Sequence, residues 1–213
     1  MSNETDAMSA SDDKKSLRDT ILARRRLMGV TAGRDAGARA RGHFMRGLGA
    51  LGLDPLPAVA AAYWPVDGEF DARFILSELH GRKVVCALPV VAGRGRPLLF
   101  RRWKPAMALE QAGFGLWQPP ADSPEAEPDL LLVPLIAFDR DGYRLGHGAG
   151  YYDLTLATLR AKKKIVAVGI GFAAQQVDRL PREAHDQRLD AAVTEKGLIL
   201  FPSAALPPVG GAA

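Results

Sequence analysis

Short apolar runs alternate along the chain with segments whose apolar residues recur every three or four positions. Each run is bounded by glycine, proline or charged residues, which is typical of buried strands. The predicted strands cover residues 58–64, 83–91, 96–103, 130–138, 164–172 and 191–200, the last as one or two short strands. The run LLLVPLIAF at 130–138 gives the strongest of these signals.

Segments with helical periodicity separate these strands. The predicted helices cover residues 11–28, 33–51, a stretch ending near Gly81, and 151–164, where lysines occupy the last turn. In the first helix, Lys14, Arg18 and Arg25 are spaced by four and seven residues, so they share one flank. We expect residues 1–12 to be disordered and residues 203–213 to form a flexible tail, because both are short and without apolar periodicity.

Strands that alternate with helices indicate an α/β fold, with a mostly parallel sheet covered on both faces. The 213-residue length suits a single domain over residues 13–202. In such sheets, ligands bind beyond the carboxyl ends of the strands. Residues that follow a predicted strand are therefore the first candidates for a site.

The charge distribution favours an anionic partner. The net charge is +4, and the positive charge is concentrated in the segments KKSLRDTILARRR and GRDAGARARGHFMR. Most of these side chains are expected on solvated helix faces, while the excess suits a nucleotide, a polyanionic metabolite or nucleic acid.

Cysteine content and hydropathy exclude several classes of protein. The single cysteine, Cys86, excludes an internal disulfide framework and a cysteine-cluster metal site, and its apolar neighbours predict a core residue. The N-terminus is polar and acidic, unlike a signal peptide, and no apolar run approaches the roughly 20 residues of a membrane span. We therefore expect a soluble cytoplasmic protein.

Three glycines stand between the strand 130–138 and the helix that begins near Tyr151. Gly146, Gly148 and Gly150 alternate with other residues in RLGHGAGYYD. Backbone N–H groups at a helix N-terminus, with no side chains in front of them, form a cradle for phosphate. Tight turns use glycine too, and neither the Walker A nor the dinucleotide-binding spacing is present, so both interpretations stay open on local spacing.

Two acids are candidate metal ligands. Asp153 stands in the first turn of the helix after the glycines, where an acid also stabilises the helix dipole. A carboxylate beside bound phosphates needs an intervening cation, and Mg²⁺ commonly binds one or two carboxylates plus phosphate oxygens. Asp186 is a candidate second ligand, although its sequence context is also that of an ordinary exposed acid in a loop.

Five segments together resemble a known family. They are KKSLR, YWPVDGEFD, FGLWQP, PLIAFDRDGYRLGHGAGYYD and LPREAHDQRLDAAVTE, and their order and spacing are similar to those of 5-formyltetrahydrofolate cyclo-ligases. The resemblance covers about residues 14 to 200 and is most specific at 134–153. It implies a three-layer α/β/α fold and an ATP- and Mg²⁺-dependent ring closure of 5-formyltetrahydrofolate to 5,10-methenyltetrahydrofolate.

The same resemblance implies a set of site residues. Nucleotide contacts are expected at Lys14, Lys15, Ser16, Leu17, Arg18, Arg144, Leu145, Gly146, His147, Gly148, Ala149, Gly150, Tyr151 and Tyr152. Folate contacts are expected at Trp64, Glu69, His147, Gly148, Ala149, Gly150 and Tyr151, metal ligands at Asp153 and Asp186, and catalytic roles at Arg144 and Glu69.

Several of these assignments leave alternatives. Glu69 either anchors the amino-pyrimidine edge of the pterin or handles the proton of atom N10. Val90 and Val91 stand where some relatives carry an aromatic pocket wall, a role that Trp103 or Trp117 could take instead.

Two other functions are compatible with parts of the sequence. A nucleic-acid-binding protein would use the basic N-terminal helices, but no RNA-recognition motif accompanies them, so nucleic acid is not the expected partner. A phosphotransferase acting on another small molecule would use the same glycine loop. We expect a monomer whose substrate, 5-formyltetrahydrofolate, also occurs in polyglutamylated forms.

Overall fold

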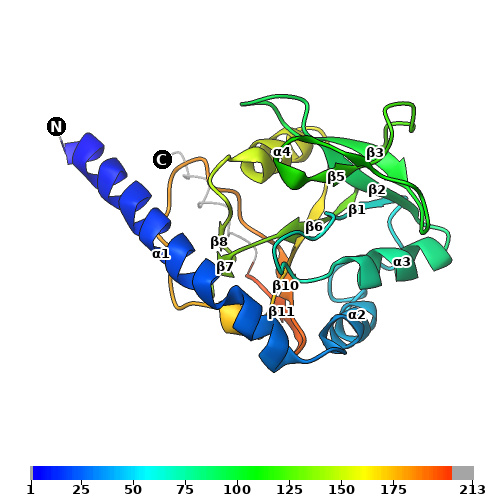
Figure 1. The fold of residues 1–213 in the computed structure, drawn as a ribbon, viewed down its shortest axis with the longest axis horizontal. Coiled ribbons are helices and arrows are strands. Elements are labelled where there is room, and N and C mark those ends of the chain that lie inside the picture. Colours follow the sequence, from blue (N-terminus) through cyan, green and yellow to red (C-terminus); the bar gives the residue numbers. More distant parts are fainter. Residues whose placement is uncertain (1, 203–213) are drawn as a thin grey trace, which may run out of the picture.

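A seven-stranded sheet forms the centre of the protein, with the strand order β11-β10-β9-β6-β1-β2-β3 (Figure 1). The structure, a computed structural model, describes residues 2–202, and side chains within that range except those of 2–12, Arg26 and Phe114. The sheet strands are β1 (Val59–Ala61), β2 (Val85–Val90), β3 (Leu99–Trp103), β6 (Leu130–Pro134), β9 (Val166–Ile170), β10 (Ala191–Val193) and β11 (Leu198–Leu200).

The sheet is mostly parallel, as the alternation of strands and helices predicts. Strands β10, β9, β6, β1 and β2 pair in parallel, whereas β3 and β11 are antiparallel edge strands. Long connections that contain a helix or a long loop allow parallel neighbours, and short turns allow antiparallel ones. The predicted α/β class is confirmed.

Helices cover both faces of the sheet. Successive strand residues point to opposite faces, so Leu130 and Leu132 join one apolar cluster and Leu131 joins the other. The first cluster packs under α2 (Ala36–Arg46) and α3 (Arg73–Gly81), and the second under α4 (Tyr151–Arg160). The result is the three-layer α/β/α arrangement implied by the resemblance. Cys86 lies in the first cluster, and burial raises the pKa of its thiol to about 12.

The apolar run at 130–138 does not form one strand. It divides into β6 and β7 (Ala137–Phe138), and β7 pairs with β8 (Arg144–Leu145) in a separate two-stranded sheet. The Nε2 atom of Gln175 donates hydrogen bonds to the carbonyl oxygens of Leu135 and Ile136. These two residues lie between β6 and β7 and do not pair in the main sheet. The hairpin β7–β8 directs the chain toward the glycine loop.

The helix bounds also differ from those expected. Helix α1 (Ser2–Ala32) begins at Ser2, where we expected disorder, and its N-terminal turns extend away from the sheet (Figure 1). Helix α2 is shorter than the expected 33–51, because it ends at Arg46 with Gly47 as its C-cap. Helix α4 ends at Arg160, before the lysines at 162–164.

Other predicted segments are refined or lie outside the structure. Residues 104–120, where no strand was predicted, contain the small hairpin of β4 (Glu110–Gln111) and β5 (Trp117–Gln118). The predicted tail at 203–213 lies outside the described residues. No helix among the described residues has the length and apolar character needed to cross a membrane.

Candidate functional site

The glycine loop lies between β8 and the first turn of α4. Gly148 and Gly150 have φ angles of +98° and +68°, and Gly150 is the N-cap of α4. Side-chain-bearing residues rarely adopt these angles, so the conformation by itself requires glycine at both positions. At Gly146 and Gly150, an added Cβ would meet no atom within 4 Å. The backbone is therefore open at the helix N-terminus, as a phosphate cradle requires.

Helix α1 contacts this loop through its basic flank. Arg18 Nε donates a hydrogen bond to the carbonyl oxygen of Gly146 over 2.7 Å. Four residues earlier, the buried Lys14 Nζ lies 2.6 Å from Glu183 Oε2 and 2.8 Å from Asp186 Oδ2. Burial lowers the pKa of Lys14, but the hydrogen bonds with the two acids raise it by more, so the ammonium stays charged. The helix thus links the glycine loop to the segment around residue 186.

Arg144 is buried and contacts protein groups on both sides. Its Nη2 atom donates to Asp153 Oδ1 over 2.9 Å, and Nη1 donates to the carbonyl oxygen of Gln187 over 2.5 Å. The backbone N–H of Gln187 also donates to Asp153 Oδ1, over 2.9 Å. Burial lowers the pKa of Arg144, and the charges of Asp153 and Asp186 oppose that change. Arg144 therefore holds the first turn of α4 against the segment at 187.

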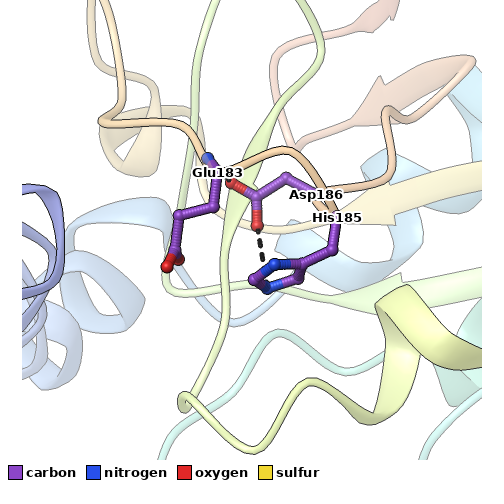
Figure 2. A group of neighbouring side chains, drawn as sticks. All are labelled: Glu183, His185 and Asp186. Atoms are coloured by element: carbon purple, nitrogen blue, oxygen red, sulfur yellow. Dashed lines mark hydrogen bonds and ion pairs between the residues drawn. The ribbon is translucent and has the colours of Figure 1, made fainter. Parts of the chain in front are cut away.

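The acidic segment PREAHD brings together more ligand atoms than the sequence indicated. One ligand atom each from Glu183, His185 and Asp186 lie within 4.8 Å of one another. Figure 2 shows the Asp186 carboxylate turned toward the His185 ring, with the Glu183 carboxylate on the side of α1. Asp153 is not in this cluster, although the negative charges of Asp153 and Asp186 both raise the pKa of Arg144. We expected Asp153 and Asp186 only; the spacing of E-A-H-D was the available signal.

The two predicted metal ligands each retain a carboxylate oxygen. Among the described residues, hydrogen bonds engage Oδ1 of Asp153 and Oδ2 of Asp186. Within residues 13–202, as far as their side chains are described, the ionic neighbour of Asp186 Oδ1 is the distant His185 Nε2, at 3.9 Å. Hard oxygen donors with free lone pairs are what Mg²⁺ prefers. The donor set fits that ion.

Glu69 lies opposite the glycine loop, in the connection between β1 and α3. Its side chain is 7% exposed, and Oε1 lies 3.3 Å from Nε2 of the exposed His147. The other oxygen, Oε2, accepts a hydrogen bond from the backbone N–H of Val66 over 3.2 Å. Burial and the charge of Glu69 raise the pKa of Tyr152. The fold thus joins Glu69 to the glycine loop.

Trp64 lies apart from these residues. The guanidinium of Arg73 stacks 4.5 Å from the centroid of the Trp64 ring. Trp64 lines an open cavity of about 520 Å³ with Trp103 and Phe74, and Glu69 is not among the lining residues. Trp103 is buried beneath this cavity, whereas Trp117 is exposed on β5. The predicted folate contacts therefore fall in two places, one beside His147 and one at this cavity.

Known proteins match the chain over nearly its whole length. The model of the 5-formyltetrahydrofolate cyclo-ligase family matches residues 10–195. The 5-formyltetrahydrofolate cyclo-ligase of Mycolicibacterium smegmatis is 34% identical over 191 residues, which are 86% of this chain and 94% of the relative. The enzyme of that name from Haemophilus influenzae is 37% identical over 131 residues, or 59% and 70% of the two chains.

A solved structure supports the same assignment. The NMR structure of Aquifex aeolicus 5,10-methenyltetrahydrofolate synthetase has a TM-score of 0.69 and 29% identity, and the match covers 93% of this chain and 98% of that chain. The family match over residues 10–195 includes most of α1, the glycine loop and the acidic segment described above. The chain belongs to the 5-formyltetrahydrofolate cyclo-ligase family.

Proposed function

We propose that this protein converts 5-formyltetrahydrofolate and ATP to 5,10-methenyltetrahydrofolate, ADP and phosphate. The observation that carries this proposal is the family match over residues 10–195, supported by a relative of that name matched over 94% of its length. The geometry agrees, because a glycine loop at a helix N-terminus faces a buried acid, Glu69, across the 3.3 Å contact with His147.

The chemistry requires an activated formyl oxygen. An amide oxygen is a poor leaving group, so the γ-phosphoryl group of ATP passes to the formyl oxygen and ADP is left. Atom N10 then attacks the formyl carbon and loses its proton, the carbon–oxygen bond breaks, and phosphate departs. Such a reaction depends on positioning and charge neutralisation more than on a protein nucleophile.

The nucleotide is assigned to the surface between α1 and the glycine loop. Residues 14–18 and 144–152 face each other there, and the Arg18–Gly146 hydrogen bond joins them. Open space at Gly146 and Gly150 leaves the backbone accessible to phosphate oxygens. In this arrangement Arg144 acts by holding Asp153 in place, and direct contact between Arg144 and a phosphate stays a prediction.

Asp153 and Asp186 are the proposed Mg²⁺ ligands. When bound, Mg²⁺ supplies positive charge to the phosphate oxygens. Each carboxylate is held by a basic side chain, Arg144 for Asp153 and Lys14 for Asp186. These contacts orient the two acids while leaving one oxygen of each outside the hydrogen bonds of the described residues.

Folate is assigned to the side of the loop that faces Glu69. A carboxylate there accepts paired hydrogen bonds from an amino-pyrimidine edge, and such charge-assisted pairs are strong and directional. The cavity beside Trp64 is the proposed second contact region. A monomeric state, cytoplasmic location, use of polyglutamylated substrate and the single-domain layout over 13–202 stay predictions.

The decisive experiment measures methenyl-folate absorbance with purified protein and 5-formyltetrahydrofolate. Product should appear only when both ATP and Mg²⁺ are present, and EDTA should abolish it. Asp186→Asn should raise the Mg²⁺ concentration needed for half-maximal rate, whereas Glu127→Gln, which changes an acid near the far end of α4, should not. Absence of product with wild-type protein would overturn the proposed activity, and turnover that survives EDTA would overturn the role of Mg²⁺.

A further inference from the structure

Arg25 is the third residue of the basic flank of α1 and the most buried of its charges. Its side chain is 2% exposed. Nε and Nη2 both donate to the carbonyl oxygen of Asp67, over 3.0 Å and 2.6 Å. The remaining atom, Nη1, is buried without a hydrogen-bond partner among the described residues and lies 3.9 Å from Glu69 Oε1. The guanidinium therefore reaches from α1 to the loop that carries Glu69.

The segment that Arg25 holds is a tight turn. The backbone N–H of Glu69 donates to the carbonyl oxygen of Val66 over 2.9 Å, and the central residues Asp67 and Gly68 have φ angles of +46° and +75°. Two central residues with positive φ are the pattern of a type I′ turn, for which Asp-Gly is a favoured pair. A paired hydrogen bond to the Asp67 carbonyl stabilises this conformation.

The charge of Arg25 also matters to Glu69. A carboxylate that is only 7% exposed has lost most of its hydration, and an opposite charge nearby offsets that cost. Oε1 has two ionic neighbours, the buried Arg25 and the exposed His147. His147 lies on the glycine loop and is open to solvent, so Arg25 is the neighbour that stays in place when a ligand displaces the imidazole.

We infer that Arg25 is a positioning residue for the pterin: it fixes the 66–69 turn and holds the Glu69 carboxylate directed toward the glycine loop. This role rests on the proposed function. It acts through Glu69, and Arg25 itself does not touch the substrate, because its guanidinium is enclosed.

Arg25→Met tests this role, with Arg25→Lys as a milder change that keeps the charge and loses the forked hydrogen bond. Calorimetry would measure affinity for 5-formyltetrahydrofolate and for a non-hydrolysable ATP analogue, and thermal unfolding would report the fold. Arg25→Met should weaken folate binding by roughly tenfold or more and leave the nucleotide affinity unchanged. Arg25→Lys should restore part of the loss.

A double-variant comparison separates positioning from general stability. If Arg25 acts through Glu69, Arg25→Met combined with Glu69→Gln should bind folate no more weakly than the weaker single variant. Arg24→Met, an exposed neighbour on α1, is the matched control and should change neither affinity.

Five results decide the question. Fully additive losses, or equal losses of folate and nucleotide affinity, would overturn the positioning role. Wild-type folate affinity in Arg25→Met would do so as well, and if that variant fails to fold, wild-type affinity in Arg25→Lys would. Wild-type protein that binds no 5-formyltetrahydrofolate would instead overturn the proposed function, and this role with it.

Discussion

Arg18 Nε donates a hydrogen bond to the carbonyl oxygen of Gly146 over 2.7 Å, although 128 residues separate the two along the chain. The Arg18 guanidinium also lies 3.5 Å from the position that a Cβ would take on Gly148. One side chain of α1 thus supports two of the three glycines in the loop. The glycine loop before α4 is therefore supported by a side chain from near the N-terminus.

Arg18→Met should weaken ATP binding much more than folate binding. The variant loses a charge-assisted hydrogen bond to the loop, which should lower ATP affinity by roughly ten- to a hundredfold. Calorimetric titration of each ligand measures the difference. Arg24→Met serves as the control on the same helix, and equal loss of both ligands in Arg18→Met would point to misfolding instead.

Two glycine substitutions separate backbone conformation from phosphate access. Gly146 has no positive φ and faces open space, so Gly146→Ala should leave the unfolding free energy unchanged while lowering ATP affinity. Gly150→Ala should in addition lower the unfolding free energy by about 1–2 kcal/mol, because its φ is +68°. Denaturant unfolding and ATP titration measure the two effects.

Gly52 offers a matched control for that strain. Its φ is +65°, an added Cβ would meet no atom within 4 Å, and it lies after α2, outside the loop. Gly52→Ala should lose about as much stability as Gly150→Ala and keep full ATP affinity. Wild-type ATP affinity in Gly146→Ala would mean that the phosphates do not approach the backbone there.

Arg144→Met should destabilise the protein. The buried guanidinium bridges Asp153 and the carbonyl oxygen of Gln187, and its loss leaves both groups without that donor. We expect the free energy of unfolding in urea to fall by about 1.5–3 kcal/mol. Arg160→Met, which breaks a more exposed pair with Asp190, should cost less than about 1 kcal/mol. Unchanged stability together with lost ATP affinity would favour a direct phosphate contact by Arg144.

Glu69→Gln should distinguish the two roles open to this acid. The variant keeps the size of the side chain and removes the charge that accepts paired hydrogen bonds. If Glu69 anchors the pterin, folate affinity should fall and ATP affinity should remain. If Glu69 handles the N10 proton, folate affinity should survive and only the single-turnover rate should fall. Wild-type values of both would remove Glu69 from the site.

Local patterns were enough to predict most elements of the fold. The apolar runs predicted five strands of the main sheet individually and left open whether 191–200 forms one strand or two; it forms β10 and β11. The glycines before Tyr151 predicted the start of α4. The division of the run at 130–138 could not be predicted, because both halves are equally apolar. Gln175, some 40 residues further along, supplies the amide that separates them.

The site residues divide in the same way. The glycine loop could be recognised in the sequence, because a loop and the start of the helix after it are both encoded by adjacent residues. The cluster of Glu183 and His185 with Asp186 was signalled only by the spacing of E-A-H-D, because the side-chain directions depend on how the loop packs against α1. The sequence also did not separate the Trp64 cavity from Glu69, because only four residues lie between Trp64 and Glu69 along the chain.

Helical spacing alone determined that Lys14, Arg18 and Arg25 share one flank of α1. Only the tertiary structure decided their partners: Asp186, the carbonyl of Gly146, and the carbonyl of Asp67. Those partners are 172, 128 and 42 residues away along the chain. The period of a helix places side chains relative to one another, but contact with a distant loop depends on the packing of the whole sheet between them.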